Sequence, residues 1–123
     1  MNASFFLPLL LLSAASPPST IHSHLLLQPN EQFVLGGDQP GAFRVAAQNT
    51  GPVPVEIRER QRAGALRTLA VLLPKQRARL SFEAGSTALL RNTAGQQAVL
   101  ELDITGSKPS RMLMGPASGD GRL

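Results

Sequence analysis

The feature that most constrains the fold is an alternation of apolar and polar residues with period two, which recurs in short segments along the chain. It is clearest over 98–105, where apolar residues (Ala98, Leu100, Leu102, Ile104) alternate with a second set (Val99, Glu101, Asp103, Thr105). Successive side chains of a strand point to opposite faces, whereas a helix cannot separate two such sets. The segment therefore predicts a strand with one buried face.

Three other segments, 43–48, 53–58 and 77–82, show the same alternation, and 24–27, 32–35, 66–73 and 87–91 show weaker patterns. Within 66–73, the continuous apolar run Leu69 to Leu73 predicts a strand covered on both sides. Turn residues (Gly, Pro, Asn, Asp, Ser) separate the segments. The chain is thus predicted to be all-β: a small antiparallel β-sandwich of about seven or eight short strands, immunoglobulin-like or similar, with a barrel as the alternative.

A weak internal similarity relates two stretches of this predicted domain. In each, a strand is followed by Asn, Thr and a glycine close behind, and then by an alternating strand; the asparagines are Asn49 and Asn92. Hairpin turns reuse these residue types, so we interpret the stretches as two similar hairpins rather than as a duplication. Both asparagines are then turn residues, where Asn tolerates a positive φ, and not ligands.

The N-terminus has the features of an export signal. An apolar run from Phe5 to Leu12, broken only by Pro8, leads into Ser13-Ala14-Ala15, the small residues that a signal peptidase requires. The run is shorter than the roughly 17 to 25 residues that span a bilayer, so no transmembrane anchor is predicted. We expect a signal peptide over 1–15, a flexible leader over 16–24, the β-domain over 25–105 and a flexible tail over 106–123. The product would be secreted or periplasmic, in a bacterium.

Residues for catalysis or metal binding are scarce. The chain has no cysteine, so a disulfide, a thiol nucleophile and a thiolate metal site are excluded. Its only histidines, His22 and His24, would give two ligands, fewer than a zinc site uses, and they lie at the edge of the predicted leader. Glu101 and Asp103 are interpreted as solvated groups on the wet face of a strand. We predict no catalytic residue, no cofactor and no metal, and hence no enzyme.

Arginine carries the only positive signal for binding. Arg58, Arg60 and Arg62 alternate, Arg67 lies beyond the next turn, and Arg77 and Arg79 repeat the spacing. If these strands share a sheet, their outward side is a basic surface suited to phosphate, sulfate or carboxylate groups. The alternative is a solvated face that Glu56 and Glu59 partly neutralise.

The chain has no Trp and no Tyr, which argues against a sugar-stacking platform and against nucleic acid as a partner. From these observations we expect an exported, non-enzymatic module that contacts another protein or serves as a structural or accessory part of the cell envelope. The alternative hypothesis is a binder of anionic envelope polymers through the arginine-rich face.

Overall fold

The computed structural model describes residues 19–106 and 114–117, and every regular element in these residues is a β-strand. The strands are β1 (Ser19–Leu27), β2 (Gln32–Gly36), β3 (Phe43–Asn49), β4 (Val55–Arg60), β5 (Leu66–Leu72), β6 (Arg77–Phe82), β7 (Thr87–Asn92), β8 (Ala98–Gly106) and β9 (Met114–Ala117). Each of the eight segments with period-two or continuous apolar patterning forms a strand, so the all-β prediction is confirmed.

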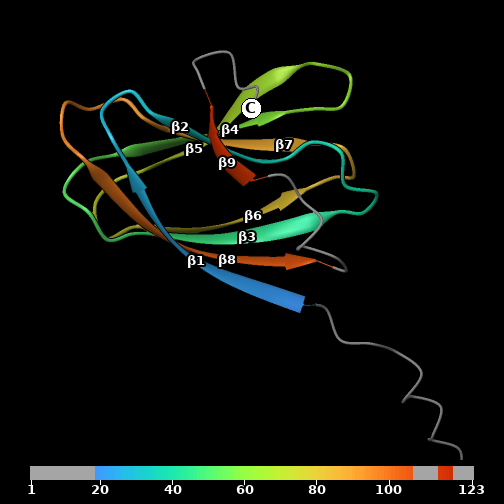
Figure 1. Cartoon of the computed structure of the whole chain (residues 1–123), viewed down its shortest axis with the longest axis horizontal. Coiled ribbons are helices and arrows are strands. Elements are labelled where there is room, and N and C mark those ends of the chain that lie inside the picture. Colours follow the sequence, from blue (N-terminus) through green and yellow to red (C-terminus); the bar gives the residue numbers. More distant parts are fainter. Residues whose placement is uncertain (1–18, 107–113, 118–123) are drawn as a thin grey trace, which may run out of the picture.

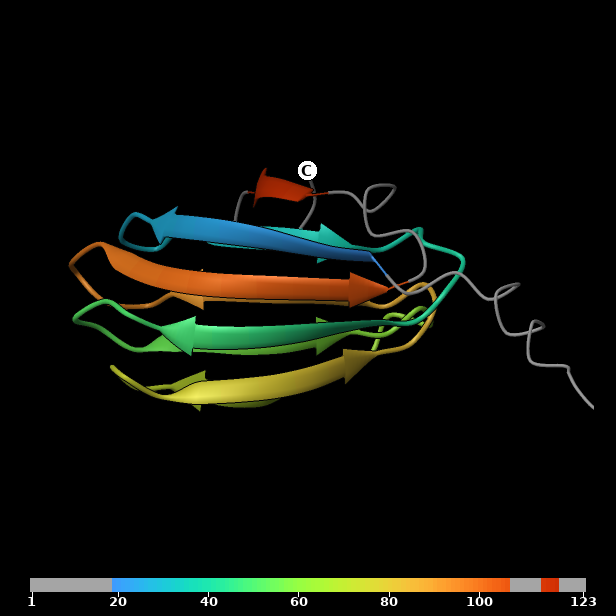
Figure 2. The ribbon, with the colours of Figure 1, turned by 90° about the horizontal axis from the view of Figure 1, so that it is seen from below.

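The strands form two stacked antiparallel sheets (Figure 1). One sheet has the order β1-β8-β3-β6, and its four strands lie side by side in Figure 2; the other has the order β5-β4-β7-β2-β9. The sheets do not close into a barrel, which confirms the sandwich over its alternative. An immunoglobulin domain orders its strands A-B-E-D and C-F-G. The nested pairing found here, β1 with β8 and β2 with β7, is that of a jelly roll.

Apolar side chains from the inner faces of both sheets fill the core. Leu100, Leu102 and Ile104 of β8 are fully buried, as the alternation predicts. Phe43 and Phe82, from the neighbouring strands β3 and β6, stack with their ring centroids 4.9 Å apart. The sandwich thus has a continuous packed interior without any disulfide.

Two predicted boundaries are wrong. Residues 19–24 belong to β1 and pair with β8, so they are not part of a flexible leader. Met114–Ala117 pairs with β2 as β9, so part of the predicted tail is a strand. The predicted signal peptide, 1–15, lies outside the described residues.

β5 also differs from its prediction. It is an edge strand rather than a strand covered on both sides, and Val71 and the adjoining Leu73 are exposed. A bulge at Leu69 interrupts its pairing with β4, because Ile57 pairs with Ala70 and Arg58 with Thr68. An apolar run can therefore occur on an edge strand when only some of its residues, here Leu69 and Leu72, reach the core.

The two similar stretches around Asn49 and Asn92 are not hairpins. Each asparagine ends a strand of one sheet, and the chain after it crosses to the other sheet. Neither asparagine has a positive φ; among the described non-glycine residues, Asn30 and Lys75 do. Both asparagines are instead fully buried.

Their side chains make equivalent hydrogen bonds. Asn49 Nδ2 donates to the carbonyls of Val53 and Leu72, at 2.8 and 2.9 Å, and its Oδ1 accepts from the Gly51 N–H at 3.0 Å. Since Leu72 belongs to the opposite sheet, this side chain ties the two sheets together.

Asn92 repeats the pattern: Nδ2 donates to the carbonyls of Leu27 and Gln96, at 3.0 and 2.6 Å, and Oδ1 accepts from the Ala94 N–H at 2.9 Å. Leu27 again lies in the opposite sheet. The internal similarity in the sequence therefore marks two buried asparagines, at one end of the sandwich, whose side-chain hydrogen bonds connect the two sheets. We call these two sets of hydrogen bonds the asparagine ties.

Candidate functional site

The outward side of the four-stranded sheet brings together charged and ionisable side chains from all four of its strands. We call it the charged face and define it by the outward side chains of β1, β8, β3 and β6: His22, His24, Glu101, Asp103, Arg44, Ala46, Gln48, Arg77 and Arg79. The opposite side chains of the same strands fill the core. Strand alternation thus selects this set, and the sheet order makes its members neighbours.

The register arranges these residues in rows across the sheet, in the order β1, β8, β3, β6. One row is His24, Glu101, Gln48, Arg77; the next is His22, Asp103, Ala46, Arg79; the third is Thr20, Thr105, Arg44, Ser81. Histidines and carboxylates therefore occupy one half of the face and arginines the other. Because neighbouring strands are about 4.8 Å apart, β8 and β6 are separated by about 10 Å, with β3 between them.

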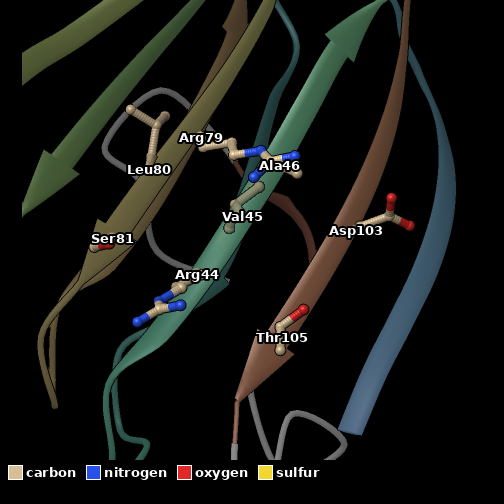
Figure 3. A pocket seen from close by; sticks show the side chains of 8 residues that line it. All are labelled: Arg44, Val45, Ala46, Arg79, Leu80, Ser81, Asp103 and Thr105. Atoms are coloured by element: carbon tan, nitrogen blue, oxygen red, sulfur yellow. The ribbon is translucent and has the colours of Figure 1, made fainter. Parts of the chain in front are cut away.

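Two depressions, each of about 270 Å³, lie on the charged face and share Ala46, Arg79 and Asp103 in their walls. Ala46 is flanked in register by Arg79 and Asp103, and its methyl group leaves the space between them open. In Figure 3 the Arg79 side chain reaches from β6 toward Ala46, and the Asp103 carboxylate points toward β1. The face is thus hollowed where its two halves meet.

The arginines on this face have no acidic partner among the described residues. The guanidinium groups of Arg44, Arg77 and Arg79 make no hydrogen bond or ion pair with the residues in 19–106 and 114–117, although all three residues are exposed. A guanidinium presents a planar fork of N–H donors that fits the oxygens of a phosphate or carboxylate. These three groups are therefore available to an anionic ligand.

The carboxylates, by contrast, are paired with the histidines. His22 Nδ1 lies 2.6 Å from Asp103 Oδ1, His22 Nε2 lies 3.1 Å from Glu101 Oε1, and His24 Nδ1 contacts Glu101 Oε2. The hydrogen bond with Asp103, followed by its charge, raises the pKa of His22 above the ordinary histidine value. The hydrogen bond with His24 is the largest cause that lowers the pKa of Glu101.

The predicted arginine rows do not share a sheet. Arg77 and Arg79 are on β6 in the four-stranded sheet, whereas Arg58 and Arg60 are on β4 and Arg67 is on β5, in the five-stranded sheet. The prediction of a single basic surface required these strands to share a sheet, and that condition is not met. The arginines of β6 instead share a face with Arg44 of β3.

The remaining predicted arginines have other surroundings. Arg67 Nε is 2.9 Å from Oε1 of the buried Glu59, so it neutralises a carboxylate of this chain. Arg58 is half-buried, with Nε 4.0 Å from Glu56 Oε1 and no hydrogen-bond partner for that nitrogen in the described parts of the chain. The Arg62 side chain lies against Gly85, where a Cβ atom would collide with its guanidinium.

The sequence did not single out Arg44 or Ala46 as site residues. The alternation over 43–48 puts both on the outward face of their strand, but only the pairing of β3 with β6 and β8 gives them charged neighbours. His22 and His24 lie in strand β1 rather than in a flexible leader, so the predicted location no longer argues against them as functional residues. Within the described ranges, no group of three or more His, Asp or Glu residues is arranged to hold a metal ion.

No helix in the residues that the structure describes is long and apolar enough to cross a membrane. No protein-family model matches the chain, and no curated protein sequence is significantly similar to it.

Proposed function

We propose that this protein is an exported, non-enzymatic binding module of the bacterial cell envelope, and that its charged face binds anionic polymers rich in phosphate or carboxylate groups. The observation that carries the proposal is the cluster of Arg44, Arg77 and Arg79 beside a hollow, with no acidic partner in the described chain for any of the three. Such a cluster costs electrostatic energy unless an anion offsets it.

The shape of the face favours an extended ligand. The two depressions join at Ala46, and the arginines follow β6 and β3 rather than closing around one point. A polymer with regularly spaced anionic groups can contact several guanidinium forks in succession, and the contacts then reinforce one another. The absence of Trp and Tyr is consistent with recognition of charge rather than of stacked rings.

The test is binding of two model polymers to the purified protein, long-chain inorganic polyphosphate and polygalacturonate, measured by isothermal titration calorimetry. The first presents phosphate groups and the second carboxylate groups, so the pair also identifies which anion is preferred. The variant Arg44→Gln/Arg79→Gln removes two guanidinium forks from one depression. We expect it to bind the preferred polymer at least about tenfold more weakly, since hydrogen bonds to charged groups contribute about 1.5 to 3 kcal/mol each.

A matched control separates the site from the general charge of the chain, which is +4. Arg62→Gln/Arg91→Gln removes the same number of positive charges from outside the charged face, and we expect it to bind within about twofold of the parent protein. Equal losses in the two variants, or no binding of either polymer, would contradict the proposal. Far-UV circular dichroism of each variant verifies that the sheets are intact.

A second variant tests the hollow rather than the charge. Ala46→Leu adds a bulky side chain between Arg79 and Asp103 while keeping an outward, partly exposed position. We expect it to weaken binding by filling the space where the two depressions join. If Ala46→Leu bound as tightly as the parent protein, the polymer would have to contact the arginines without entering the hollow.

A further inference from the structure

The histidine half of the charged face is built to change its charge near neutral pH. His22 contacts a carboxylate through each ring nitrogen, Asp103 at Nδ1 and Glu101 at Nε2. A neutral imidazole has only one N–H donor, whereas the imidazolium ion has two, so only protonated His22 can donate both hydrogen bonds. The raised pKa of His22, caused first by the hydrogen bond with Asp103, agrees with this geometry.

Protonation of His22 reduces the net negative charge of the histidine half of the face. The titratable and charged groups around His22 are His24 on its own strand, Glu101 and Asp103 on β8, and the guanidinium groups farther across the sheet, which belong to Arg44, Arg77 and Arg79. With both histidines neutral, three positive and two negative groups give the face a net charge of +1. Protonation of His22 raises this net charge by one.

We infer that protonation of His22 regulates the binding of anionic polymers to the charged face, so that binding strengthens as the pH falls. The inference rests on the proposed function and adds its regulation. At high pH the carboxylates of Asp103 and Glu101 repel an anion bound at the arginines; at low pH the imidazolium ion of His22, which contacts both, partly neutralises them. Ligand binding must in turn favour protonation, because the coupling between two sites is reciprocal.

The size of the effect follows from the sheet spacing. Two strand spacings, about 10 Å, separate β1 from β3. At that distance in water and at low salt, one positive charge strengthens the binding of a unit negative charge about twofold. A single charge on His22 that acts on a ligand with several charges should therefore change the affinity about fivefold between pH 8 and pH 5.5, after partial screening. In about 0.5 M salt the change should nearly vanish.

The experiment measures binding of long-chain polyphosphate at pH 8, 7, 6 and 5.5 to the parent protein and to His22→Gln/His24→Gln. The internal phosphates of this probe have no ionisation in that range, so a change in affinity reports on the protein. We expect about fivefold tighter binding by the parent protein at the lowest pH, and less than a twofold change for the variant. A pH dependence that is the same in both proteins, or absent from the parent, would overturn the inference while leaving the proposed function in place.

Absence of binding at every pH would instead refute the proposed function, and the inference with it. A second measurement uses the fact that the chain has only two histidines. Their imidazole C–H signals can be resolved by NMR and assigned with His22→Gln and His24→Gln. We expect the pKa of His22 to rise when polyphosphate is added; an unchanged or lowered pKa would also overturn the inference.

Discussion

The two asparagine ties offer a sharp test of what holds the sheets together. Asn49→Ala and Asn92→Ala each remove a fully buried amide with three hydrogen bonds, one of which crosses between the sheets. At about 1 kcal/mol net for each hydrogen bond, either substitution should lower the free energy of unfolding by about 3 kcal/mol. For a domain of this size that corresponds to a fall of roughly 15 °C in melting temperature.

Because the chain lacks Trp and Tyr, unfolding in urea is best followed by far-UV circular dichroism at the β-sheet minimum. Thr50→Ala and Gln97→Ala are matched controls, since each truncates an exposed polar side chain in the same two connections. We expect them to stay within about 0.5 kcal/mol of the parent protein. If Asn49→Ala and Asn92→Ala cost less than about 1 kcal/mol, the ties would not stabilise the sandwich.

Three further predictions follow from single contacts. The contribution of His22 to stability is complete below its unfolded-state pKa of 6.5 and is lost as the pH rises through its raised folded-state pKa. The contribution of Glu101 is complete above its unfolded-state pKa of 4.5 and is lost as the pH falls through its lowered folded-state pKa. Thermal melts should therefore show that the contacts of His22 and Glu101 stabilise the fold most between pH 4.5 and 6.5. His22→Gln should reduce the loss of stability above pH 6.5. Arg67→Gln should destabilise by about 2 kcal/mol in urea unfolding, because it leaves the buried Glu59 carboxylate without its cation. Phe82→Ala should cost about 4 kcal/mol in the same assay, by opening a cavity at the stacked pair in the core.

The strands could be predicted from the sequence because period-two alternation is a local property. The segment Ala98 to Thr105 contains all the information needed to assign its inner and outer rows, and the structure buries Leu100, Leu102 and Ile104 as expected. The predicted leader failed for a related reason. In β1 the inward positions are Ile21, Ser23, Leu25 and Leu27, and the serine and two outward histidines hide the alternation of an edge strand.

Sheet order could not be predicted, because alternation says which face a side chain occupies and not which strand lies beside it. Arg60 and Arg77 are close in sequence, yet their strands lie in opposite sheets. His22 and Asp103 are 81 residues apart, yet they are in hydrogen-bond contact. Sequence proximity would lead one to expect that consecutive strands pair with each other. The jelly-roll order instead pairs the first strand with the eighth and the third with the sixth.

The same order explains why charge is sorted on one face. A jelly roll places β1 and β8 at one side of a sheet and β3 and β6 at the other. Histidines therefore face carboxylates across one strand pair, and each arginine faces a neutral residue across the other. Ala46 lies at the junction, where a long side chain would bridge the halves or fill the hollow. The proposed anion binding and its proposed control by protons can therefore be altered separately, because the arginines and the histidines lie on different strand pairs of one sheet.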